Sequence, residues 1–325
     1  MYKDFFAFLN RHQSFILCSH DPADADGLGA ELALSCILKA LGKEFHIINA
    51  SPIPSNFAFM DEEHIVDFWN KETHDHLPEK SAMLILDTSD EYNIGKQREL
   101  LDRVREVYIL DHHEPPPQSS LKGHIDSKAA STSELAVEIA AEANVSLDLK
   151  SATAAYTGIV YDTGYFAYSK TSSRTFAAAL KLVDTGVAPY QVYNNLSESA
   201  STGALLLQKL VFSTMEMHAG GKIAVQVLRK EALEETGANF EDAESFVNMP
   251  LKSRDVSVSI LVKENLQGNV RFSIRSKGSI NVSKIAQTFG GGGHVAASGF
   301  KCPAGIKDAM ENILRQVIEK VELQL

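Results

Sequence analysis

Three short apolar runs in this chain each end in residues that could bind a metal ion. These residues are His20, Asp24 and Asp26 after Phe15–Ser19, Asp87 after Met83–Leu86, and Asp111, His112 and His113 after Val107–Leu110. Short apolar runs bounded by polar residues are typical of strands that are buried on both faces of a parallel sheet. The carboxyl ends of such strands share one edge of the sheet, where ligands bind. The pattern therefore predicts a metal site at this edge, with more than one ion.

The types of these residues restrict the metal. Carboxylates with one or two imidazoles favour Mn²⁺, Mg²⁺ or Fe²⁺ over structural zinc, which prefers thiolate and histidine ligands. Asp24 and Asp26 lie two residues apart in a predicted loop, so that a turn could direct each carboxylate at a different ion. Any one of these residues alone could be an ordinary solvated loop residue. Three clusters at three strand ends favour the metal site.

The elements that must position these residues alternate between strand and helix in the first half of the chain. Apolar residues recur at helical spacing over 27–41, and Ser131 is a candidate N-cap for a further helix. The charged segment Gly95–Arg105 fits a surface helix, and Ala152–Val160 fits another helix. This alternation predicts a doubly wound α/β domain with a mainly parallel sheet, extending to about residue 190.

The pattern changes in the second half of the chain. Tyr190–Met217 is predicted to be mainly helical and to form a connector. Beyond it, three segments alternate like strands with one buried face, which predicts a smaller α+β domain. These segments are Ile223–Leu228, Val256–Val262 and Val270–Ser276. We therefore expect a first domain over 1–190, a helical linker over 191–218 and a second domain over 219–325.

A glycine run and nearby cations in the second half suggest an anion-binding site. The run Gly290–Gly293 precedes His294, and glycines allow backbone N–H groups to approach an anion closely. Arg271, Arg275 and Lys277 alternate along one predicted strand, so all three are expected on the same face. This pattern favours a phosphate grip over a flexible loop beside a solvated strand.

The composition restricts the class of protein. The 325 residues are 44% hydrophobic and 22% charged, as in ordinary globular proteins, and suffice for two domains. A net charge of −11 argues against binding to long nucleic acid, although it is compatible with a small phosphorylated substrate. No apolar run is long enough for a membrane span, and the start lacks a signal-peptide pattern. We therefore expect no membrane partner. The three well-separated cysteines are expected to be reduced, which indicates a cytoplasmic protein.

In their order along the chain, these motifs resemble those of the DHH/DHHA1 phosphoesterase family, over nearly the whole length. In the first half the matching motifs are His20–Gly29, Asp87, Asp111-His112-His113 and Asp162-Thr163-Gly164. In the second half they are Arg275-Ser276-Lys277, the run Gly290–Gly293 with His294, and Ala296–Gly299.

The resemblance implies two divalent metal ions, with Mn²⁺ expected and Mg²⁺ or Fe²⁺ as alternatives. Their implied ligands are His20, Asp24 and Asp87 for one ion, and Asp26, Asp87, His112 and Asp162 for the other. Asp87 would bridge the ions, and an acidified water would attack phosphorus. His113 would donate a proton to the leaving oxygen or bond the phosphate. Asp111 would orient the adjacent histidine.

The resemblance also implies substrate binding by the second domain. Together with the strand cations, the expected residues are Arg271, Arg275, Ser276, Lys277, Gly291, Gly292, Gly293 and His294. Length and the second domain favour the compact nano-RNase/pAp-phosphatase type, which trims very short oligonucleotides and dephosphorylates adenosine 3′,5′-bisphosphate (pAp). A phosphodiesterase for cyclic or linear dinucleotides is the second reading, and a non-catalytic nucleotide sensor is the alternative from another class. A homodimer is left open.

Overall fold

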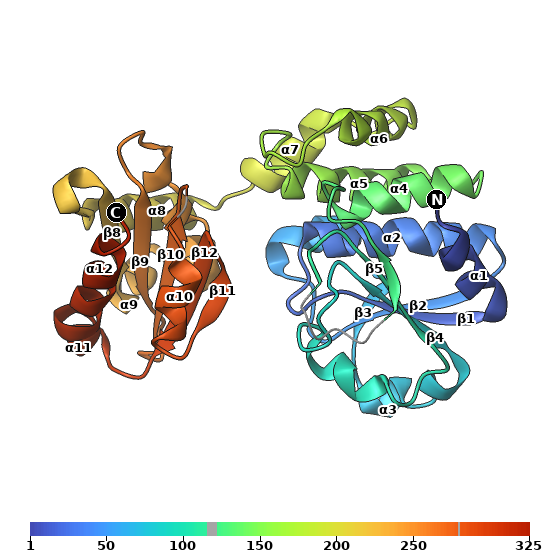
Figure 1. Ribbon diagram of the computed structural model, residues 1–325, viewed down its shortest axis with the longest axis horizontal. Helices are drawn as coiled ribbons and strands as arrows, with labels where there is room; N and C mark the ends of the chain where they lie inside the picture. Colours follow the sequence, from blue (N-terminus) through green and yellow to red (C-terminus); the bar gives the residue numbers. More distant parts are fainter. Residues whose placement is uncertain (116–121, 279) are drawn as a thin grey trace. The chain divides into compact units, whose positions relative to one another are not determined.

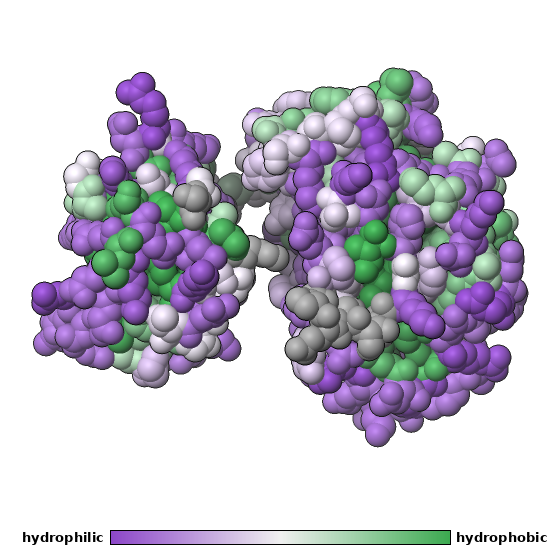
Figure 2. All heavy atoms as spheres, viewed as in Figure 1, coloured by the Kyte–Doolittle hydropathy of each residue, from purple (hydrophilic) through white to green (hydrophobic). Residues whose placement is uncertain are grey.

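The structure is a computed structural model that describes residues 1–115, 122–278 and 280–325. The chain divides into two compact units, 1–199 and 200–325, and each unit has its own sheet and hydrophobic core (Figure 1). The visible face of each unit is mainly hydrophilic (Figure 2). Among the described helices, none combines the length and the hydropathy that a bilayer span requires.

The first unit is built on a parallel sheet with the strand order β3-β2-β1-β4-β5-β6. The strands are β1 Ser14–Cys18, β2 Glu44–Asn49, β3 Val66–Phe68, β4 Ala82–Leu86, β5 Val107–Asp111 and β6 Gly123–Ile125. Every pairing between these neighbours is parallel. The central strands are apolar and buried along almost their whole length, because helices cover both faces of a doubly wound sheet. The predicted architecture of this half is confirmed.

The helices of the first unit pack on this sheet or on one another (Figure 1). They are α1 Lys3–Arg11, α2 Ala25–Ala40, α3 Lys71–His74, α4 Thr132–Glu142, α5 Leu149–Asp162, α6 Ser173–Asp184 and α7 Pro189–Ser197, with 3₁₀ helices η1 Ser55–Met60, η2 Pro78–Lys80 and η3 Gly95–Leu100. Helix α2 lies against the sheet, α4 and α5 lie over α2, and α3 lies toward the other face (Figure 1). The largest core cluster fills the space between the sheet and α2, α4 and α5.

The predicted surface helix over Gly95–Arg105 is wrong. Only Gly95–Leu100 is helical, in the tighter 3₁₀ form, and a turn follows it. Within it the side chain of Gln97 is fully buried, and its Nε2 donates to the carbonyl oxygen of Ile48 on β2 at 2.5 Å. This hydrogen bond to a distant strand fixes the segment against the sheet. The local pattern of charged residues could not predict such a contact.

The second unit is built on a mixed sheet with the order β11-β12-β10-β9-β8-β7. The strands are β7 Glu216–His218, β8 Ile223–Leu228, β9 Val258–Glu264, β10 Val270–Ser276, β11 Gly292–His294 and β12 Ala297–Cys302. Strands β8 and β9 are parallel, whereas the other neighbours are antiparallel. This mixed sheet with helices confirms the predicted α+β class.

Helices cover both faces of the second sheet. They are α8 Thr202–Ser213, α9 Lys230–Thr236, α10 Val282–Gln287, α11 Ile306–Asp308 and α12 Leu314–Glu322, with the π-helix η8 Ala309–Ile313 and the 3₁₀ helices η4 Ala219–Gly221, η5 Phe240–Ala243, η6 Phe246–Asn248 and η7 Pro250–Lys252. One core cluster joins the sheet to α10 and α12. Another joins the opposite face to α8, α9 and η6.

Candidate metal centre

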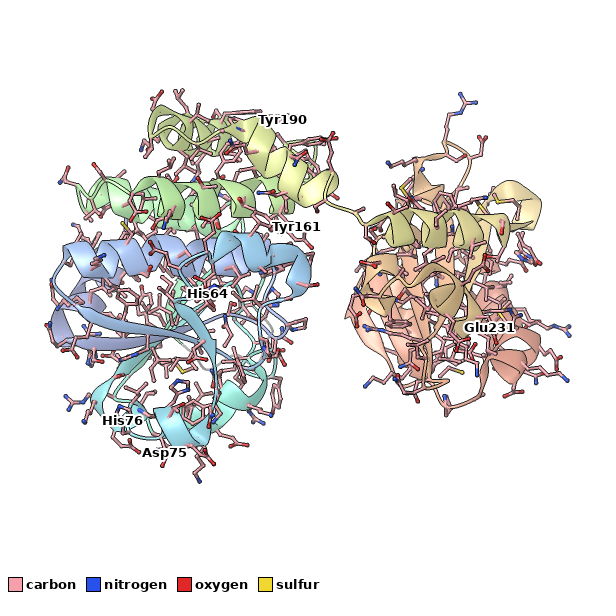
Figure 3. The ribbon with its side chains drawn as sticks, turned by 180° about the vertical axis from the view of Figure 1, so that it is seen from behind. His64, Asp75, His76, Tyr161, Tyr190 and Glu231 are labelled. Atoms are coloured by element: carbon pink, nitrogen blue, oxygen red, sulfur yellow. The ribbon has the colours of Figure 1, made fainter. Side chains whose placement is uncertain are left out.

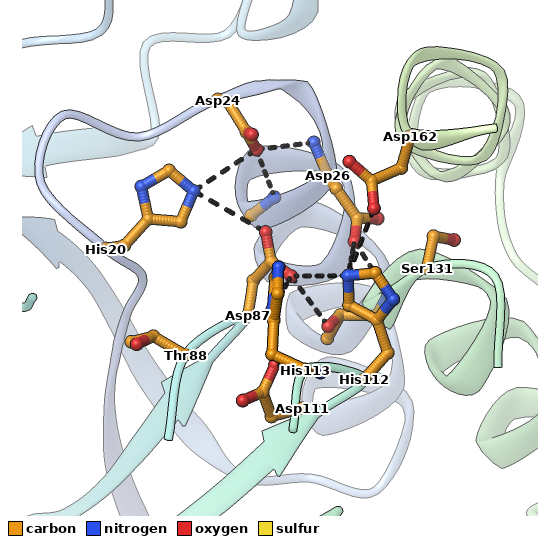
Figure 4. A network of polar contacts seen from close by, with 12 residues as sticks. His20, Asp24, Asp26, Asp87, Thr88, Asp111, His112, His113, Ser131 and Asp162 are labelled. Carbon is orange, nitrogen blue, oxygen red and sulfur yellow. Dashed lines mark hydrogen bonds and ion pairs between the residues drawn. The ribbon is translucent and has the colours of Figure 1, made fainter. Parts of the chain in front are cut away.

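The carboxyl ends of β1, β4 and β5 bring the predicted ligands together (Figure 4). Among the histidines, cysteines and acidic residues of the described part of the chain, three groups have ligand atoms within 4.8 Å of one another. The groups are His20 with Asp24 and Asp87, Asp26 with His112 and Asp162, and Asp87 with His112 and His113. All six residues predicted to bind metal therefore lie in one place.

Helix α2 begins between Asp24 and Asp26, so the prediction of a loop holds for Asp24 and is wrong for Asp26. Asp24 is the N-cap, and its Oδ1 accepts hydrogen bonds from the N–H groups of Asp26 at 3.0 Å and Gly27 at 3.1 Å. Asp26 lies in the first turn and is fully buried. Carboxylates stabilise a helix start because they satisfy its free N–H groups and its positive dipole end. The same two residues therefore begin the helix and supply carboxylates to the centre.

The N-terminus of helix α4 fixes the carboxylate of Asp26. The N–H of Thr132 donates to Asp26 Oδ2 at 2.6 Å, and the N–H of Ser133 donates to Oδ1 at 2.9 Å. The hydroxyl of Thr132 also donates to Asp87 Oδ1 at 2.9 Å. The sequence marked this helix start by its Ser131 cap but gave no sign that its amides face the centre.

Asp87 lies between two histidines. His20 Nε2 is 3.6 Å from Asp87 Oδ2 and 3.4 Å from Asp24 Oδ1. On the other side, His112 Nε2 is 3.5 Å from Asp87 Oδ1. The two carboxylate oxygens of Asp87 thus face different imidazoles, which is the arrangement expected of a carboxylate between two neighbouring ions.

His112 faces a ring of carboxylates. Its Nε2 lies 3.0 Å from Asp162 Oδ2, 3.5 Å from Asp87 Oδ1 and 3.8 Å from Asp26 Oδ2. This buried nitrogen nevertheless has no hydrogen bond of acceptable geometry within the described residues. A nitrogen ligand surrounded by carboxylate oxygens and left without such a bond fits a metal ion.

The electrostatics of the centre also fit cations. Burial and the neighbouring Asp26 raise the pKa of Asp87 well above its usual value, and burial and Asp162 raise the pKa of Asp26. Burial lowers the pKa of His112, but Asp162 and the other carboxylates outweigh it and raise that pKa to about 9. Divalent ions would offset the repulsion among these carboxylates. The donor set therefore fits the metal ions that the sequence predicts.

Asp111 and His113 form a pair at the rim of the centre. Asp111 Oδ1 accepts a hydrogen bond from the N–H of His113 at 3.0 Å and lies 2.9 Å from His113 Nδ1. Asp111 is fully buried, whereas 43% of the side chain of His113 is exposed. Burial opposes ionisation of Asp111, but the hydrogen bond to His113 outweighs it and lowers the pKa of Asp111. An ionised Asp111 therefore orients a solvent-facing imidazole.

The predicted substrate-binding residues lie in the second unit. Arg271 and Arg275 share one face of β10, because they alternate with the core residues on its other face. Burial lowers the pKa of Arg275, and its Nη1 donates to the carbonyl oxygen of Ile274 at 3.1 Å. Lys277 lies beyond the end of the strand, and its Nζ donates to the carbonyl oxygen of Ser253 at 2.6 Å. The prediction of three cations on one strand is therefore wrong for Lys277, and only Arg271 and Arg275 lie on β10.

The other predicted substrate-binding residues are mostly held by backbone contacts. Ser276 is buried, and its Oγ donates to the carbonyl oxygen of Ile280 at 2.8 Å. Gly292–His294 forms the edge strand β11, which pairs with β12. A Cβ at Gly291 or Gly293 would lie 2.2 or 2.5 Å from a carbonyl oxygen of β12, so this close approach requires glycine. The side chain of His294 lies outside what the structure describes.

Both halves of this chain match domains of known protein families. The N-terminal domain of the DHH family matches residues 14–159, and the DHHA1 domain matches residues 220–323. "Bifunctional oligoribonuclease and PAP phosphatase NrnA" from Thermus thermophilus is 28% identical, over 94% of this chain and 89% of that protein. "Cyclic-di-AMP phosphodiesterase GdpP" from Geobacillus thermodenitrificans is 25% identical, over 93% of this chain but only 47% of that protein.

A solved structure shows the same fold. The crystal structure of an exopolyphosphatase-related protein from Bacteroides fragilis superposes with a TM-score of 0.91 at 24% identity, and covers 98% of this chain and 95% of that chain. The DHH match spans β1, β4 and β5 and ends three residues before Asp162, and the DHHA1 match spans strands β8 to β12 of the mixed sheet. The chain therefore belongs to the family of phosphoesterases that combine a DHH domain with a DHHA1 domain.

Proposed function

We propose that this protein hydrolyses phosphoester bonds in very short oligoribonucleotides and removes the 3′-phosphate of pAp, by a two-metal mechanism. Asp87 carries the proposal, because its two oxygens face His20 and His112 on opposite sides. The relative from Thermus thermophilus, which is similar over nearly the whole of both chains, has both activities in its name.

The proposed metal ligands follow the grouping of the side chains. One ion would be held by His20, Asp24 and Asp87, and the other by Asp26, Asp87, His112 and Asp162. Their carboxylate-rich chemistry favours Mn²⁺, with Mg²⁺ or Fe²⁺ as alternatives. When bound, two such ions supply an acidified water as nucleophile and offset negative charge on the phosphoryl oxygens.

The remaining chemistry is assigned to side chains of the centre. His113 would donate a proton to the leaving oxygen or a hydrogen bond to the phosphate, because its ring is exposed and oriented by Asp111. Asp26 would keep its orientation while charge develops, because the amides of Thr132 and Ser133 hold both of its oxygens.

The second unit would bind the rest of the substrate. Arg271 and Arg275 offer two guanidinium groups on one face of β10, which suits a phosphate. Ser276, Lys277, Gly291–Gly293 and His294 would contribute in the same region, as the family resemblance implies. In this proposal the catalytic domain is 1–190, the linker 191–218 and the substrate domain 219–325, in a cytoplasmic enzyme.

A phosphodiesterase for cyclic or linear dinucleotides is the second candidate. The relative from Geobacillus thermodenitrificans, whose name gives cyclic-di-AMP as substrate, aligns with almost the whole of this chain. Both candidate activities would use the same metal ligands. The two activities would therefore be distinguished by their reaction products, because the metal centre is the same in both.

A substrate profile tests the proposal. The full-length protein with Mn²⁺ would be assayed on pAp, a 5′-phosphorylated diadenylate, cyclic-di-AMP, a five-mer and a 24-mer. We expect kcat/KM to be highest for pAp and the two-mer and to fall with length, because the protein is acidic and a long strand needs more phosphate contacts. Preferential cleavage of cyclic-di-AMP would favour the second candidate. Binding without hydrolysis would favour a nucleotide sensor.

A further inference from the structure

Three exposed tyrosines follow one another beside the metal centre. Tyr161 directly precedes the ligand Asp162 at the C-terminal end of α5, where Figure 3 labels it. Tyr165 and Tyr168 lie in the turn that follows. The exposed fractions of the three side chains are 41%, 45% and 64%. The chemistry proposed above uses none of them.

The backbone of this turn is in a strained conformation. Gly164, Tyr165 and Phe166 have φ angles of 53°, 61° and 64°, in the left-handed region that bulky residues rarely adopt. Phe166 is anchored, because its ring stacks on Phe176 with centroids 5.2 Å apart and its N–H donates to Thr163 Oγ1 at 3.0 Å. Local strain in a well-held turn is characteristic of functional segments. In this turn the side chain of Tyr165 is exposed, while that of the next residue, Phe166, packs against the core.

Tyr168 folds back onto the turn that carries Asp162. A Cβ at Gly164 would lie only 2.4 Å from Cζ of Tyr168, so the ring rests directly on the backbone of this glycine. The N–H of Tyr168 also donates to the carbonyl oxygen of Thr163 at 2.9 Å. The ring of Tyr168 therefore packs against Gly164, two residues after the proposed ligand Asp162, while most of the side chain stays exposed.

The other two rings have lateral supports. Tyr165 packs edge-on against Tyr193 of α7, with centroids 5.6 Å apart, and its hydroxyl bonds to Ser197 Oγ. Tyr161 packs edge-on against Phe57 of η1, with centroids 5.3 Å apart. Supported rings lose little conformational freedom when a flat partner binds to them.

The phenol of Tyr161 lies near two carboxylates of the metal centre. Partial burial and the carboxylates of Asp24 and Asp162 raise its pKa, and Tyr168 and Tyr165 act in the same direction. The phenol of Tyr161 therefore lies at the edge of the centre that Asp24 and Asp162 form.

We propose that Tyr161, Tyr165 and Tyr168 form a stacking shelf for the nucleobase of the nucleotide whose phosphate occupies the metal centre. The proposal rests on the function proposed above and adds the way in which the base is recognised. A phosphate held beside Asp162 carries its base on the adjoining sugar, within reach of rings on the same turn. Aromatic stacking tolerates any base, because every base has a π-face. The shelf would thus distinguish nucleotides from other phosphoesters and would discriminate weakly among bases.

Binding of a fluorescent nucleotide tests the shelf without catalysis. The probe is a 2-aminopurine nucleoside with a 5′-phosphate and a non-hydrolysable 3′-phosphonate, added to full-length protein with Mg²⁺. Stacking quenches 2-aminopurine, so we expect quenching by the wild type and by Tyr165→Phe and Tyr168→Phe. Tyr165→Leu and Tyr168→Leu should lose the quenching and raise Kd about 5- to 150-fold. Tyr190→Leu, at a tyrosine of α7 that is 70% exposed, is the matched control and should change Kd less than about twofold.

An analogue without the base separates stacking from a structural role. The Leu variants, shown to be folded by circular dichroism, should bind the same 5′-phosphate, 3′-phosphonate sugar without its base as the wild type does. Equal weakening for both analogues, or unchanged Kd for the 2-aminopurine probe, would overturn the shelf. If the wild type quenches the probe but hydrolyses no nucleotide, the proposed function fails and the shelf stands. If pAp is hydrolysed and the Leu variants match the wild type, the shelf fails and the function stands.

Discussion

At the scale of single residues, the backbone of Asp87 explains how one carboxylate can face two imidazoles. Asp87 directly follows β4 and has a φ of 60°, a left-handed conformation that aspartate tolerates better than most residues. The hydroxyl of Thr132 donates to its Oδ1, and its Oδ2 faces His20. Backbone and side chain together thus fix the orientation of this carboxylate before any ion binds.

Asp87→Asn should lower kcat by more than about a hundredfold while leaving the fold intact. Asparagine keeps the shape and the acceptor for Thr132 but removes the charge between the two ions. Steady-state kinetics on pAp and measurement of the bound metal would check this. Asp61→Asn is the matched control, because Asp61 is a buried aspartate that accepts hydrogen bonds from the N–H groups of Ile65 and Val66. A smaller loss at Asp87 with unchanged metal content would contradict the bridging role.

Glu31 supports the strand end that precedes His20. It is fully buried on α2 and accepts a hydrogen bond from Asn49 Nδ2 at 3.0 Å, and Asn49 Oδ1 accepts from the N–H of Ser19 at 3.0 Å. Burial raises the pKa of Glu31 from its usual 4.5 to about 7. Between these values the folded protein keeps a proton that the unfolded chain releases. Glu31 therefore makes folding less favourable as pH rises through this window.

Glu31→Gln should remove this pH dependence, because glutamine is neutral and can still accept the hydrogen bond from Asn49. Near pH 5 the variant and the wild type should be similarly stable. At pH 8 the variant should exceed the wild type by about 1–3 kcal/mol in the free energy of unfolding. Urea titrations of both proteins at the two pH values would measure this. A difference of the same size at both pH values would refute the assignment.

At the scale of elements, predictions from sequence succeeded for segments whose apolar composition alone indicates that they are buried. The runs that lead to β1, β4 and β5 are apolar throughout, so their positions could be predicted within about one residue. The amides of Thr132 and Ser133 could not be assigned to Asp26, because more than a hundred residues separate the partners. No local pattern records such a contact. The strand β11 was missed for a similar reason, since its glycines match the backbone of β12.

The contact between α2 and α5 sets the distance between two proposed ligands. A Cβ at Gly29 of α2 would lie 2.6 Å from the carbonyl oxygen of Ala154 on α5, so the two helices touch at their backbones. Helix α2 carries Asp26 and α5 carries Asp162. Moving these helices apart would therefore widen the site around His112.

Gly29→Ala should lower the free energy of unfolding by about 1–3 kcal/mol, because the extra methyl group overpacks this contact. This loss should appear even though alanine favours helix formation over glycine by about 1 kcal/mol. Gly305→Ala is the control, because its Cβ would meet no atom within 4 Å and its φ is −66°. Denaturant titrations would compare the variants. A stabilised Gly29→Ala protein would show that the helices are not in backbone contact.

At the scale of the whole molecule, metal uptake is coupled to protons. In the metal-free protein, burial opposes the charged form of His20 and His112, but their neighbouring carboxylates outweigh it and raise the pKa values to about 11 and about 9. Both imidazoles are therefore protonated at neutral pH. Metal ions bind only the deprotonated nitrogen, so uptake must release these protons.

Filling the centre at pH 7 should release at least two protons, one from each imidazole, and metal affinity should rise with pH. Calorimetric titration of Mn²⁺ in buffers with different ionisation enthalpies would count them. His20→Gln should release about one proton fewer, whereas His12→Gln, at a partly buried histidine paired with Glu106, should not change the count. Uptake without proton release would contradict the charge state described here.

The start of helix α4 makes metal binding visible in hydrogen exchange. Amides in the first turn of a helix usually lack an intrahelical partner and exchange quickly with solvent, but those of Thr132 and Ser133 are bonded to Asp26. Burial and Asp162 raise the pKa of Asp26, and bound cations would favour its ionised form, which is the stronger hydrogen-bond acceptor. Added metal should therefore slow exchange at these two amides and leave Ala204, capped by Ser201 at the start of α8, unchanged. Deuterium uptake by a helix that supplies no ligand would thus report how full the metal centre is.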